Sequence, residues 1–399
     1  MNVSGSDGAE VIIDERQAIA AAKRLAELAI TDAAWRDSER IYPLEALSLF
    51  SRSGLGSLSV PKEYGGGGLP YRTVAEVFRL ISAADPSLGQ IPQNHFGLIQ
   101  FLREEGTPAQ HRALFPLIVA GQRLGNGGPE KNTRHTRDVQ ARLTQQPDGL
   151  RLTGEKFYST GALFADIVVT TALNDRGEAV MAFMPREASG LTIVDDWSGM
   201  GQRTTASGTV RLTKVPVDPA LVVPLPSANK PSLRGPVSQL LQAAIDAGIA
   251  RGAFEQACGF IRDHSRPWID AGVARNAEDA QLLADVGRVW TELTAAEALL
   301  RRAASTLDDT ASRPLDAEAA ARASIAVAKA KALTTEAALK VSEKLLEWGG
   351  SRATLGEHNL DRHWRNARTH TLHDPVRWKY HAIGNYALNA VFPARHAWI

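Results

Sequence analysis

The hydrophobic periodicity of this chain changes twice, and those changes constrain its fold more than any single motif does. From about residue 14 to 121, apolar side chains recur at helical spacing. From about 124 to 224, short β-branched runs alternate with turn signals such as Asn174-Asp175-Arg176-Gly177. From about residue 236 the helical spacing returns in longer stretches. The chain is therefore expected to be helical, then β, then helical again.

This order predicts a mixed α and β protein with three units. The expected units are an N-terminal helical domain over 1–121, a middle β-barrel or sandwich over 122–232 and a C-terminal four-helix bundle over 233–399. The four glycines from Gly65 to Gly68 predict a loop in the first unit, because glycine loses too much backbone entropy in a helix. The fourth helix of the bundle should start near Asp374. Helices this long usually also bury a face against another subunit.

Composition and charge argue against several functional classes. The 399 residues are 44% hydrophobic and 22% charged, as in ordinary globular proteins. Lys+Arg number 45 and Asp+Glu 44, so the net charge is +1, and this near-neutral balance argues against nucleic-acid binding. The single cysteine, Cys258, cannot form an internal disulfide. No apolar run reaches membrane-spanning length and no export signal follows Met1, so we expect a cytoplasmic protein without a membrane partner.

Two stretches of the strand-rich region carry groups that could meet a ligand. Residues 152–161 are expected to form a strand and a turn with exposed hydroxyls, which could hydrogen-bond a flat heterocycle. The local pattern alone favours a hairpin whose Ser and Thr side chains cap the turn. Residues 195–208 combine glycines and hydroxyls with Trp197 and Arg203, a loop whose backbone can approach a ligand closely. Surface loops share this composition, so neither stretch identifies a ligand by itself.

Histidines are concentrated near the end of the chain, where six of the ten lie beyond Gly350. The spacing of His370 and His373 can bring two imidazoles together, but a metal centre needs further ligands, and only Asp374 is close in sequence. We therefore expect a hydrogen-bonding or phosphate-facing cluster, and no metal, in this region. The lone His95 lies in a helical segment and has the pattern of a buried, hydrogen-bonded side chain.

The order of these pieces resembles the acyl-CoA dehydrogenase superfamily of flavoproteins over nearly the whole chain. The matching motifs are VPKEYGG at 60–66, LTGEKFYSTG at 152–161 and GMGQR at 199–203. The long motif DRHWRNARTHTLHDP at 361–375 is similar to a narrower branch, the flavin monooxygenases. That branch contains the dibenzothiophene monooxygenases and the sulfur-acquisition oxidoreductases of dimethyl sulfone use, and the chain resembles the latter group most.

The resemblance implies a flavin between the β domain and the helical bundle of a homotetramer. The residues implied to line the isoalloxazine ring are Asn126, Tyr158, Ser159, Thr160 and Trp197. Among them, Thr160 would lie near N5 and the reactive C4a atom. The cofactor would be FMN, although the resemblance leaves FAD open.

The resemblance also assigns residues outside the β domain. Arg266 would bind the cofactor phosphate across a subunit interface. Gly349 and Gly350 occupy the region that contacts the adenine half of the cofactor in FAD-using relatives. His95 and His373 would face the substrate and hydrogen-bond a flavin peroxide or a substrate oxygen. The implied catalytic set is therefore His95, Thr160 and His373.

The residue types distinguish two chemistries. Dehydrogenation of an acyl thioester needs a carboxylate base near flavin N5. The matching region, 368–375, has imidazoles instead, and Asp374 before Pro375 is expected to cap the following helix. Oxygenation needs donors that hold the oxygens of a C4a-hydroperoxyflavin, and the three residues of the implied catalytic set supply such donors. No Gly-x-Gly-x-x-Gly follows a strand, so a separate reductase should supply reduced FMN.

The sequence therefore predicts a flavin-dependent monooxygenase of sulfur acquisition that uses reduced flavin and O2 to oxygenate a small organosulfur compound. The alternatives are an acyl-CoA dehydrogenase-type FAD enzyme that oxidises an acyl thioester, and a flavin-free helical scaffold or binding protein. One departure from the dibenzothiophene monooxygenases concerns 127–130, where Gly-Gly-Pro-Glu replaces a serine-rich sequence. This departure leaves the lid around 127–138, and with it the substrate, undefined.

Overall fold

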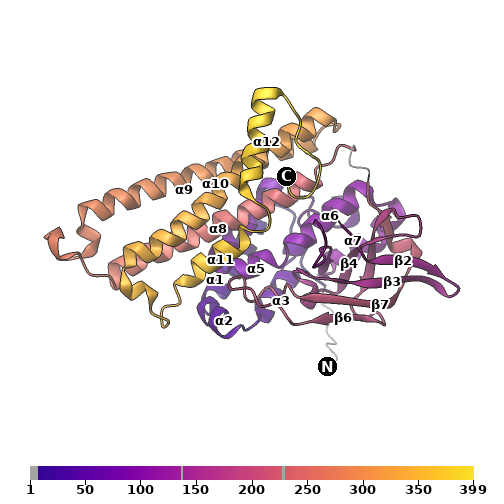
Figure 1. Ribbon diagram of the computed structural model, residues 1–399, viewed down its shortest axis with the longest axis horizontal. Coiled ribbons are helices and arrows are strands. Elements are labelled where there is room, and N and C mark those ends of the chain that lie inside the picture. The colour runs from indigo at the N-terminus through magenta and orange to yellow at the C-terminus, as the bar shows by residue number, and fades with distance from the viewer. Residues whose placement is uncertain (1–7, 136–137, 227–229) are drawn as a thin grey trace.

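The computed structural model describes residues 8–135, 138–226 and 230–399. Long C-terminal helices extend to one side of a β-sheet, and the N-terminal helices lie between the two (Figure 1). These N-terminal helices are α1 (Glu15–Ile30), α2 (Ala33–Glu39), α3 (Leu44–Arg52), α4 (Tyr71–Ala84), α5 (Pro86–Gln90), α6 (Gln93–Glu105) and α7 (Pro108–Val119). Asp85 caps the start of α5 by accepting the Ser87 N–H over 2.9 Å. The glycine run at 65–68 lies outside the helices, as predicted.

The described part of the sheet has eight strands. They are β1 (Leu124–Gly127), β2 (Arg142–Gln146), β3 (Gly149–Lys156), β4 (Ile167–Leu173), β5 (Ala179–Pro185), β6 (Leu191–Val194), β7 (Thr209–Val217) and β8 (Val222–Pro224). Their order is β6-β7-β3-β2-β4-β5-β8, and β1 pairs in parallel with β4. Strands β2 and β3 form a hairpin, because they pair antiparallel with Gln146 opposite Gly149.

The sheet consists of two halves that meet at β2 and β4, where Arg142 pairs with Leu173. Side chains from both halves share one core, to which Leu152 contributes from β3 and Val168 from β4. A second core lies between the sheet and helices α6 and α7, with Phe115 buried at its centre. The mixed α and β class predicted from the sequence is confirmed.

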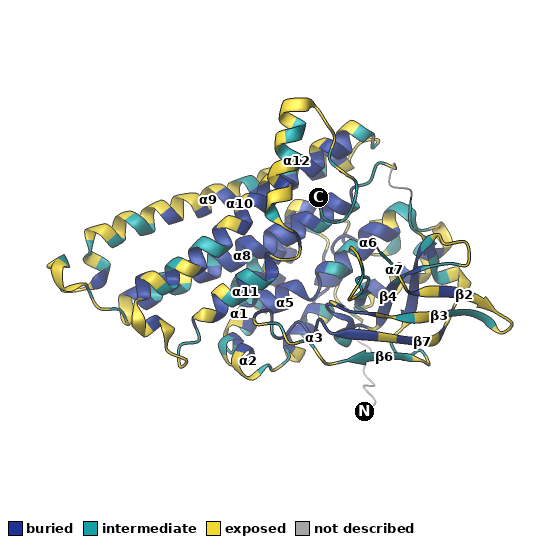
Figure 2. Cartoon of the chain, in the orientation of Figure 1, coloured by how far each residue is buried: buried dark blue, intermediate teal, exposed yellow. Residues whose placement is uncertain are grey.

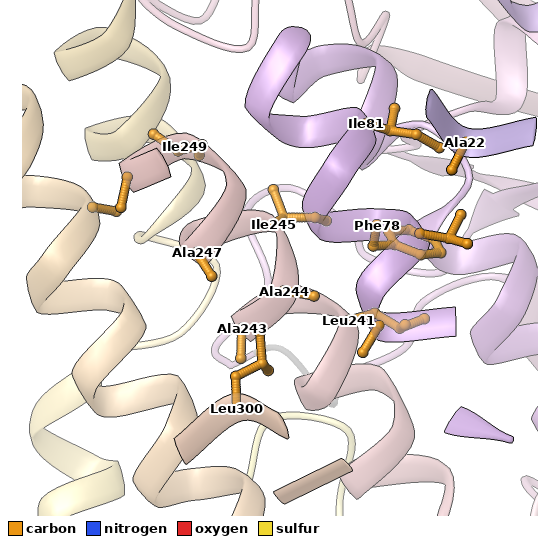
Figure 3. Packing of buried hydrophobic residues seen from close by; sticks show 14 of the residues in the cluster. Ala22, Phe78, Ile81, Leu241, Ala243, Ala244, Ile245, Ala247, Ile249 and Leu300 are labelled. Carbon is orange, nitrogen blue, oxygen red and sulfur yellow. The ribbon is translucent and has the colours of Figure 1, made fainter. Parts of the chain in front are cut away.

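The C-terminal helices follow the sheet. They are α8 (Arg234–Asp263), α9 (Ala280–Ala311), α10 (Ala317–Gly349), α11 (Asp361–His370) and α12 (Val376–Asn389). Helix α8 is buried along most of its length and contacts α4, α9 and α10 (Figures 2 and 3). Small side chains such as Ala243, Ala244 and Ala247 let these helices approach closely, while Ile245 and Phe78 fill the space toward α4 (Figure 3). The predicted C-terminal helical bundle is confirmed.

The end of the bundle differs from the expectation in one respect. The last helix starts at Val376, and Pro375 precedes it without a side-chain cap, so the expectation that Asp374 caps this helix is wrong. The Asp374 carboxylate is buried instead, with Oδ2 lying 2.5 Å from Lys379 Nζ. Helix α12 packs on α10 but leaves most of its surface exposed (Figure 2). In the ranges that the structure describes, no helix combines the length and apolar character needed to cross a membrane.

Candidate functional site

The turn that follows β3 holds several of the residues singled out by sequence. Tyr158 has a left-handed backbone (φ 58°), and at Gly161 (φ 78°) a Cβ would lie 2.8 Å from the Ile91 carbonyl oxygen. Glycine therefore lets the turn lie directly against the end of α5. Ser159 is 1% exposed, its N–H donates to the Gly208 carbonyl, and its Oγ has no hydrogen-bond partner. Buried polar groups are normally paired, so this hydroxyl is an exception among the described residues, and its contact with a ligand stays a prediction.

A chain of hydroxyls determines the direction of the Thr160 side chain. Thr160 Oγ1 lies 2.7 Å from Ser207 Oγ, which in turn lies 2.7 Å from Thr205 Oγ1. Thr205 Oγ1 also lies 3.0 Å from the Gln202 carbonyl oxygen, which can only accept. Thr205 must then donate to Gln202, Ser207 must donate to Thr205, and Thr160 must donate to Ser207. This order uses the single hydroxyl proton of Thr160 and leaves its oxygen as an acceptor.

Asn126 and Trp197 border the same turn. Asn126 donates from Nδ2 to the Tyr158 carbonyl over 3.4 Å and accepts the Gly128 N–H at Oδ1. The Trp197 ring lies 6.3 Å from the Tyr158 ring, centroid to centroid. A cavity of about 280 Å³ adjoins this tryptophan and is also lined by Arg40, Ser198, Gly199, Met200 and Arg203. The structure thus brings the predicted ring-lining residues together, while their contacts to a ligand stay predictions.

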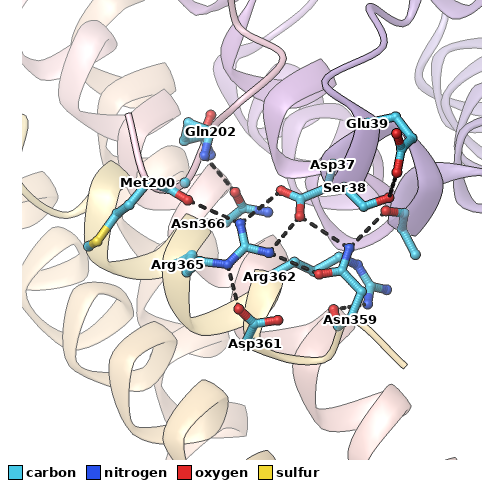
Figure 4. A network of polar contacts seen from close by, with 12 residues as sticks. Asp37, Ser38, Glu39, Met200, Gln202, Asn359, Asp361, Arg362, Arg365 and Asn366 are labelled. Atoms are coloured by element: carbon cyan, nitrogen blue, oxygen red, sulfur yellow. Dashed lines mark hydrogen bonds and ion pairs between the residues drawn. The ribbon is translucent and has the colours of Figure 1, made fainter. Parts of the chain in front are cut away.

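The loop that carries Trp197 is held against α11 and α2. The Gln202 N–H donates to Asn366 Oδ1 over 2.6 Å. A Cβ on Gly201 would lie 2.0 Å from the Arg365 carbonyl oxygen, so this close approach requires glycine. The Arg365 guanidinium pairs with Asp37 of α2 over 2.6 Å (Figure 4). These contacts join the sheet, the N-terminal helices and α11 at one point.

Buried polar side chains from α5, α8, α10 and α11 form a hydrogen-bonded network near the turn. Asp246 Oδ1 lies 2.6 Å from His370 Nδ1, and Asp246 Oδ2 lies 2.6 Å from Lys331 Nζ. His370 Nε2 lies 3.0 Å from Gln90 Oε1, and the Gln90 amide nitrogen lies 3.2 Å from His373 Nε2. Asp246, His370, Gln90 and Lys331 are all at most 2% exposed. A buried network of this kind is rigid only if every hydrogen-bond donor in it meets an acceptor.

His373 is the outer end of this network. Its Nδ1 lies 2.6 Å from the His370 carbonyl oxygen, its Nε2 faces Gln90, and the residue as a whole keeps surface exposed to solvent. The two imidazoles lie 4.9 Å apart, centroid to centroid, and the hydrogen bond between the two residues joins the His373 ring to the His370 backbone carbonyl. Gln90 directly precedes Ile91, whose carbonyl adjoins Gly161, so the network and the turn are neighbours. As placed, neither ring nitrogen of His373 points to a ligand.

Burial and ion pairing set the charges in this network. Burial lowers the pKa of the His370 imidazole, although the Asp246 carboxylate opposes this shift. Desolvation by the surrounding protein, together with the nearby His370, lowers the pKa of His373 to about 4. Burial acts to raise the pKa of Asp246, but Lys331 and His370 outweigh it and hold that pKa well below its usual range. Asp246 is therefore a carboxylate.

His95, which the resemblance places on the substrate side, lies buried in the protein. It is 1% exposed, with Nε2 lying 2.8 Å from the Gly56 carbonyl and Nδ1 lying 3.0 Å from the Leu124 backbone nitrogen. Nε2 must donate and Nδ1 must accept, so the backbone uses both ring nitrogens. Burial lowers the pKa of His95 to about 4, which keeps the ring neutral. As placed, the side chain joins α6 to β1, and its assignment to the substrate side stays a prediction.

The remaining predicted cofactor residues lie at the far end of the bundle. Arg266 is exposed in the connection between α8 and α9, while Gly349 ends α10 and Gly350 follows it. Arg352 Nη1 lies 3.2 Å from the His264 carbonyl oxygen, which ties the two segments together. This end of the bundle points away from the sheet (Figure 1). Within one chain these residues do not reach the turn after β3, so a shared site requires a second copy.

The segment after β1 is anchored at its start. Lys156, which is fully buried, lies with Nζ 2.6 Å from Glu130 Oε1. Glu130 also accepts the backbone N–H groups of Gln140 and Ala141. These bonds tie the beginning of the expected lid to the end of β3, next to the turn. Residues 136–137 of that lid lie outside the described residues.

Sequence reasoning missed the interior of the polar network. Asp246 and Lys331 each interrupt an Ala-rich apolar run, and a charge in such a run predicts a buried ion pair. Gln90 gives no comparable signal, because its partner His370 is 280 positions away. In the three described ranges, no group of three or more His, Cys, Asp or Glu side chains could hold a metal ion.

The sequence is similar to that of known families and proteins. Residues 14–122 match the acyl-CoA dehydrogenase N-terminal domain, and residues 240–378 match the acyl-CoA dehydrogenase C-terminal domain. The chain is 34% identical to dibenzothiophene monooxygenase of Mycolicibacterium goodii over 357 residues, 86% of each protein. It is 32% identical to the probable FMNH2-dependent monooxygenase SfnC of Pseudomonas putida, over 95% of this chain and 96% of that protein.

The fold is likewise similar to solved structures. FMN-bound TdsC from Paenibacillus sp. A11-2 matches with a TM-score of 0.91 and 34% identity, over 96% of this chain and 100% of that one. Methanesulfinate monooxygenase MsuC from Pseudomonas fluorescens matches with a TM-score of 0.88 and 30% identity, over 96% of this chain and 99% of that one. These matches span the sheet and both helical regions. The chain therefore belongs to the acyl-CoA dehydrogenase superfamily, in its dibenzothiophene monooxygenase-like flavin monooxygenase branch, and is an oxidoreductase.

Proposed function

We propose that this protein is a two-component monooxygenase of sulfur acquisition that uses reduced FMN and O2 to oxygenate a small organosulfur compound. The observation that carries the proposal is the turn after β3, which holds the unpartnered Ser159 hydroxyl and the acceptor oxygen of Thr160 and packs against Ile91, next to Gln90 of the polar network. Relatives of this chain are named for dibenzothiophene, methanesulfinate and FMNH2. These names support a sulfur compound as substrate and FMN as cofactor.

The groups of the turn fit a reduced flavin. A reduced flavin carries a hydrogen on N5. The Thr160 hydroxyl donates to Ser207, so its oxygen is left to accept a hydrogen bond from that N5–H group. The buried Ser159 hydroxyl can hydrogen-bond a carbonyl or ring nitrogen. The Tyr158 and Trp197 rings supply flat apolar surface. When bound, the reduced flavin supplies the electrons that activate O2, and the protein contributes binding, orientation and electrostatics.

The carboxylates near His373 argue against the acyl-CoA dehydrogenase alternative. That reaction needs a carboxylate that is free to remove a proton. Asp246 is buried and paired with Lys331, and Asp374 is buried and paired with Lys379. Neither carboxylate is available as a base while these ion pairs hold. The imidazole of His373, a residue that keeps surface exposed to solvent, is instead the group that would hydrogen-bond the oxygen or the substrate.

A second subunit would complete the site. We propose a homotetramer in which Arg266 of one chain binds the cofactor phosphate next to the turn of another. Gly349 and Gly350 lie at the same end of the bundle and would meet the adenine half if FAD were bound. Large apolar side chains such as Trp290 on α9 and Trp378 on α12 are more than half exposed, which suits burial between subunits.

Reduced flavin would reach the site from a separate protein. The sequence has no Gly-x-Gly-x-x-Gly after a strand, so we propose a diffusible transfer of reduced FMN from a flavin reductase. Such a reductase draws on pyridine nucleotides, and we therefore propose the cytoplasm as the location of the pair.

A substrate panel tests this proposal. Purified protein would be supplied with FMN, NADH and a flavin reductase in air, and products from dimethyl sulfone, methanesulfinate and dibenzothiophene would be followed by mass spectrometry. We expect an oxygenated product from at least one of them, and none when the protein is omitted. A parallel assay would offer butyryl-CoA with a dye as electron acceptor. Dye reduction by butyryl-CoA without any oxygenated sulfur product would overturn the proposal in favour of a dehydrogenase.

A further inference from the structure

The amide of Gln90 lies between two imidazoles that compete for it. Its oxygen lies 3.0 Å from His370 Nε2, and its nitrogen lies 3.2 Å from His373 Nε2. Both histidines use Nδ1 as a donor, His370 toward the Asp246 carboxylate and His373 toward the His370 carbonyl oxygen. A neutral imidazole with hydrogen on Nδ1 has only a lone pair on Nε2. Two neutral rings would therefore both need a donor from Gln90, which presents its NH2 group to one side only.

The orientation of the Gln90 amide therefore depends on whether His370 is cationic or neutral. When His370 carries two protons, its Nε2–H donates to Gln90 Oε1, and the Gln90 NH2 group donates to His373; this is the arrangement described above. When His370 is neutral, one contact must fail. His370 is 0% exposed, whereas His373 reaches solvent, so an unmatched Nε2 costs more on His370. The amide then reverses to donate to His370, and its oxygen faces the lone pair of His373 Nε2.

We propose that Gln90 is a positioning residue for His373 and that its hold on His373 depends on the charge of His370. A cationic His370 keeps the His373 ring on Gln90. A neutral His370 releases His373 Nε2, which can then turn toward the neighbouring Thr160 turn. This inference rests on the proposed function, in which His373 hydrogen-bonds the oxygen or the substrate.

The surrounding charges give the direction of the pH dependence. The charged groups that face the two imidazoles are Asp246 of α8, Lys331 of α10 and Asp374 before α12, whose carboxylate is paired with Lys379. Asp246 and Asp374 favour a cation on His370, and Lys331 opposes it, but burial outweighs them and lowers its pKa below the ordinary 6.5. The released arrangement should therefore dominate at neutral pH, and the held arrangement should appear as the pH falls below 6.5.

Crystal structures of the flavin-free enzyme at acidic and at mildly alkaline pH test this inference without any turnover. We expect the Gln90–His373 contact near 3.2 Å in acid and its loss at alkaline pH. Gln90→Leu should release the ring at both pH values. Gln90→Glu should extend the held arrangement to higher pH, because a carboxylate favours the doubly protonated imidazoles, which can donate to it from Nε2. A wild-type contact that does not change between the two pH values would overturn the inference, whatever reaction the enzyme catalyses.

The pH profile of the loaded enzyme supplies the second test. Wild-type turnover should rise as the pH increases toward 6.5, the Gln90→Leu variant should lose this rise, and Gln90→Glu should move it to higher pH. Gln93→Leu is the matched control, because Gln93 is equally buried but bonds Ser238 outside the network. Loss of the rise in both leucine variants would contradict the inference. Oxygenation with an unaltered profile in Gln90→Leu would refute the inference while leaving the proposed function intact.

Discussion

The hydroxyl of Thr160 lies 2.7 Å from the hydroxyl of Ser207, and this contact decides what Thr160 can offer a ligand. Because the Ser207 hydroxyl donates its hydrogen bond to Thr205, it can only accept a hydrogen bond from Thr160. The Thr160 oxygen is thereby left as an acceptor beside the buried, unpartnered hydroxyl of Ser159. The proposed flavin site uses this arrangement, because a reduced flavin has both a donor and an acceptor along one edge.

Ser207→Ala should weaken the binding of reduced FMN. The substitution removes the acceptor that directs the Thr160 proton, so Thr160 can turn its own hydrogen toward the N5–H of the flavin. The loss of one directed hydrogen bond is worth about 1 kcal/mol, or about fivefold in Kd. Anaerobic titration with reduced and oxidised FMN measures it, and oxidised FMN, which lacks the N5 hydrogen, should be affected less. Ser342→Ala, which removes a buried hydroxyl inside α10, is the control. Equal losses for both flavin forms would contradict the assignment.

Glu130→Gln should destabilise the protein more than an exposed substitution does. Lys156 is fully buried with Nζ 2.6 Å from Glu130, so the change leaves an ammonium without a counter-charge. Removing one partner of a buried ion pair typically costs about 3 kcal/mol. Denaturant unfolding would measure the loss, with Glu187→Gln, whose side chain is 93% exposed, as the control. Equal stability of the two variants would show that the pair does not anchor the segment after β1.

The sequence predicts the order of elements well because most of it is local. The hairpin at β2 and β3 and the loop at 65–68 follow from turn and glycine patterns that act over a few residues. The turn at 158–161 combines a local signal, Gly161 in a left-handed conformation, with distant contacts, because Thr160 bonds Ser207 and the Ser159 N–H donates to Gly208. Resemblance to a known family adds the expectation of a flavin and of the motifs that would bind it, which local patterns alone do not identify.

The contacts of the histidines are not predictable from local sequence. Both ring nitrogens of His95 bond backbone groups, one on a carbonyl 39 positions earlier and one on a strand 29 positions later. His373 faces Gln90, which is 283 positions away. Which nitrogen is free therefore depends on tertiary packing. The position of Arg266 likewise depends on tertiary structure, because it lies in the connection between the long helices α8 and α9.

Acid should destabilise the protein through its buried histidines. Burial lowers the pKa of His95 to about 4, so between pH 6.5 and about 4 the unfolded chain binds more protons than the folded one. Stability then falls as the pH falls through this window, by roughly 3 kcal/mol for this residue. His363 and His370, whose pKa values burial also lowers, act in the same direction. The free energy of unfolding against pH measures this effect. His95→Gln should reduce the slope, and the exposed His381→Gln should not. An unchanged slope in the His95 variant would contradict the prediction.

Arg266→Ala should weaken FMN binding about tenfold, as expected for the loss of one charge-assisted hydrogen bond to a phosphate. Arg275→Ala is the control, because Arg275 lies in the same connection and pairs with Glu278. Flavin titration of both variants measures the difference. Equal affinities would remove Arg266 from the cofactor site.

Subunit mixing tests whether Arg266 acts across an interface. A Ser159→Phe variant should block its own turn but keep a functional Arg266, whereas Arg266→Ala keeps the turn. Tetramers reassembled from both variants should contain some sites with both features intact, and these should regain wild-type affinity. If verified mixed tetramers show no recovery of affinity, Arg266 does not act across an interface. It then either serves the turn of its own subunit or does not contact the cofactor.

Oxygen-18 labelling tests the central claim most directly. The protein would be loaded anaerobically with reduced FMN and the best substrate of the organosulfur panel, then mixed with oxygen-18 gas for a single turnover. The account predicts one labelled oxygen atom in the product and none when labelled water replaces labelled gas. Return of oxidised FMN with hydrogen peroxide and no labelled product from any sulfur compound would contradict it.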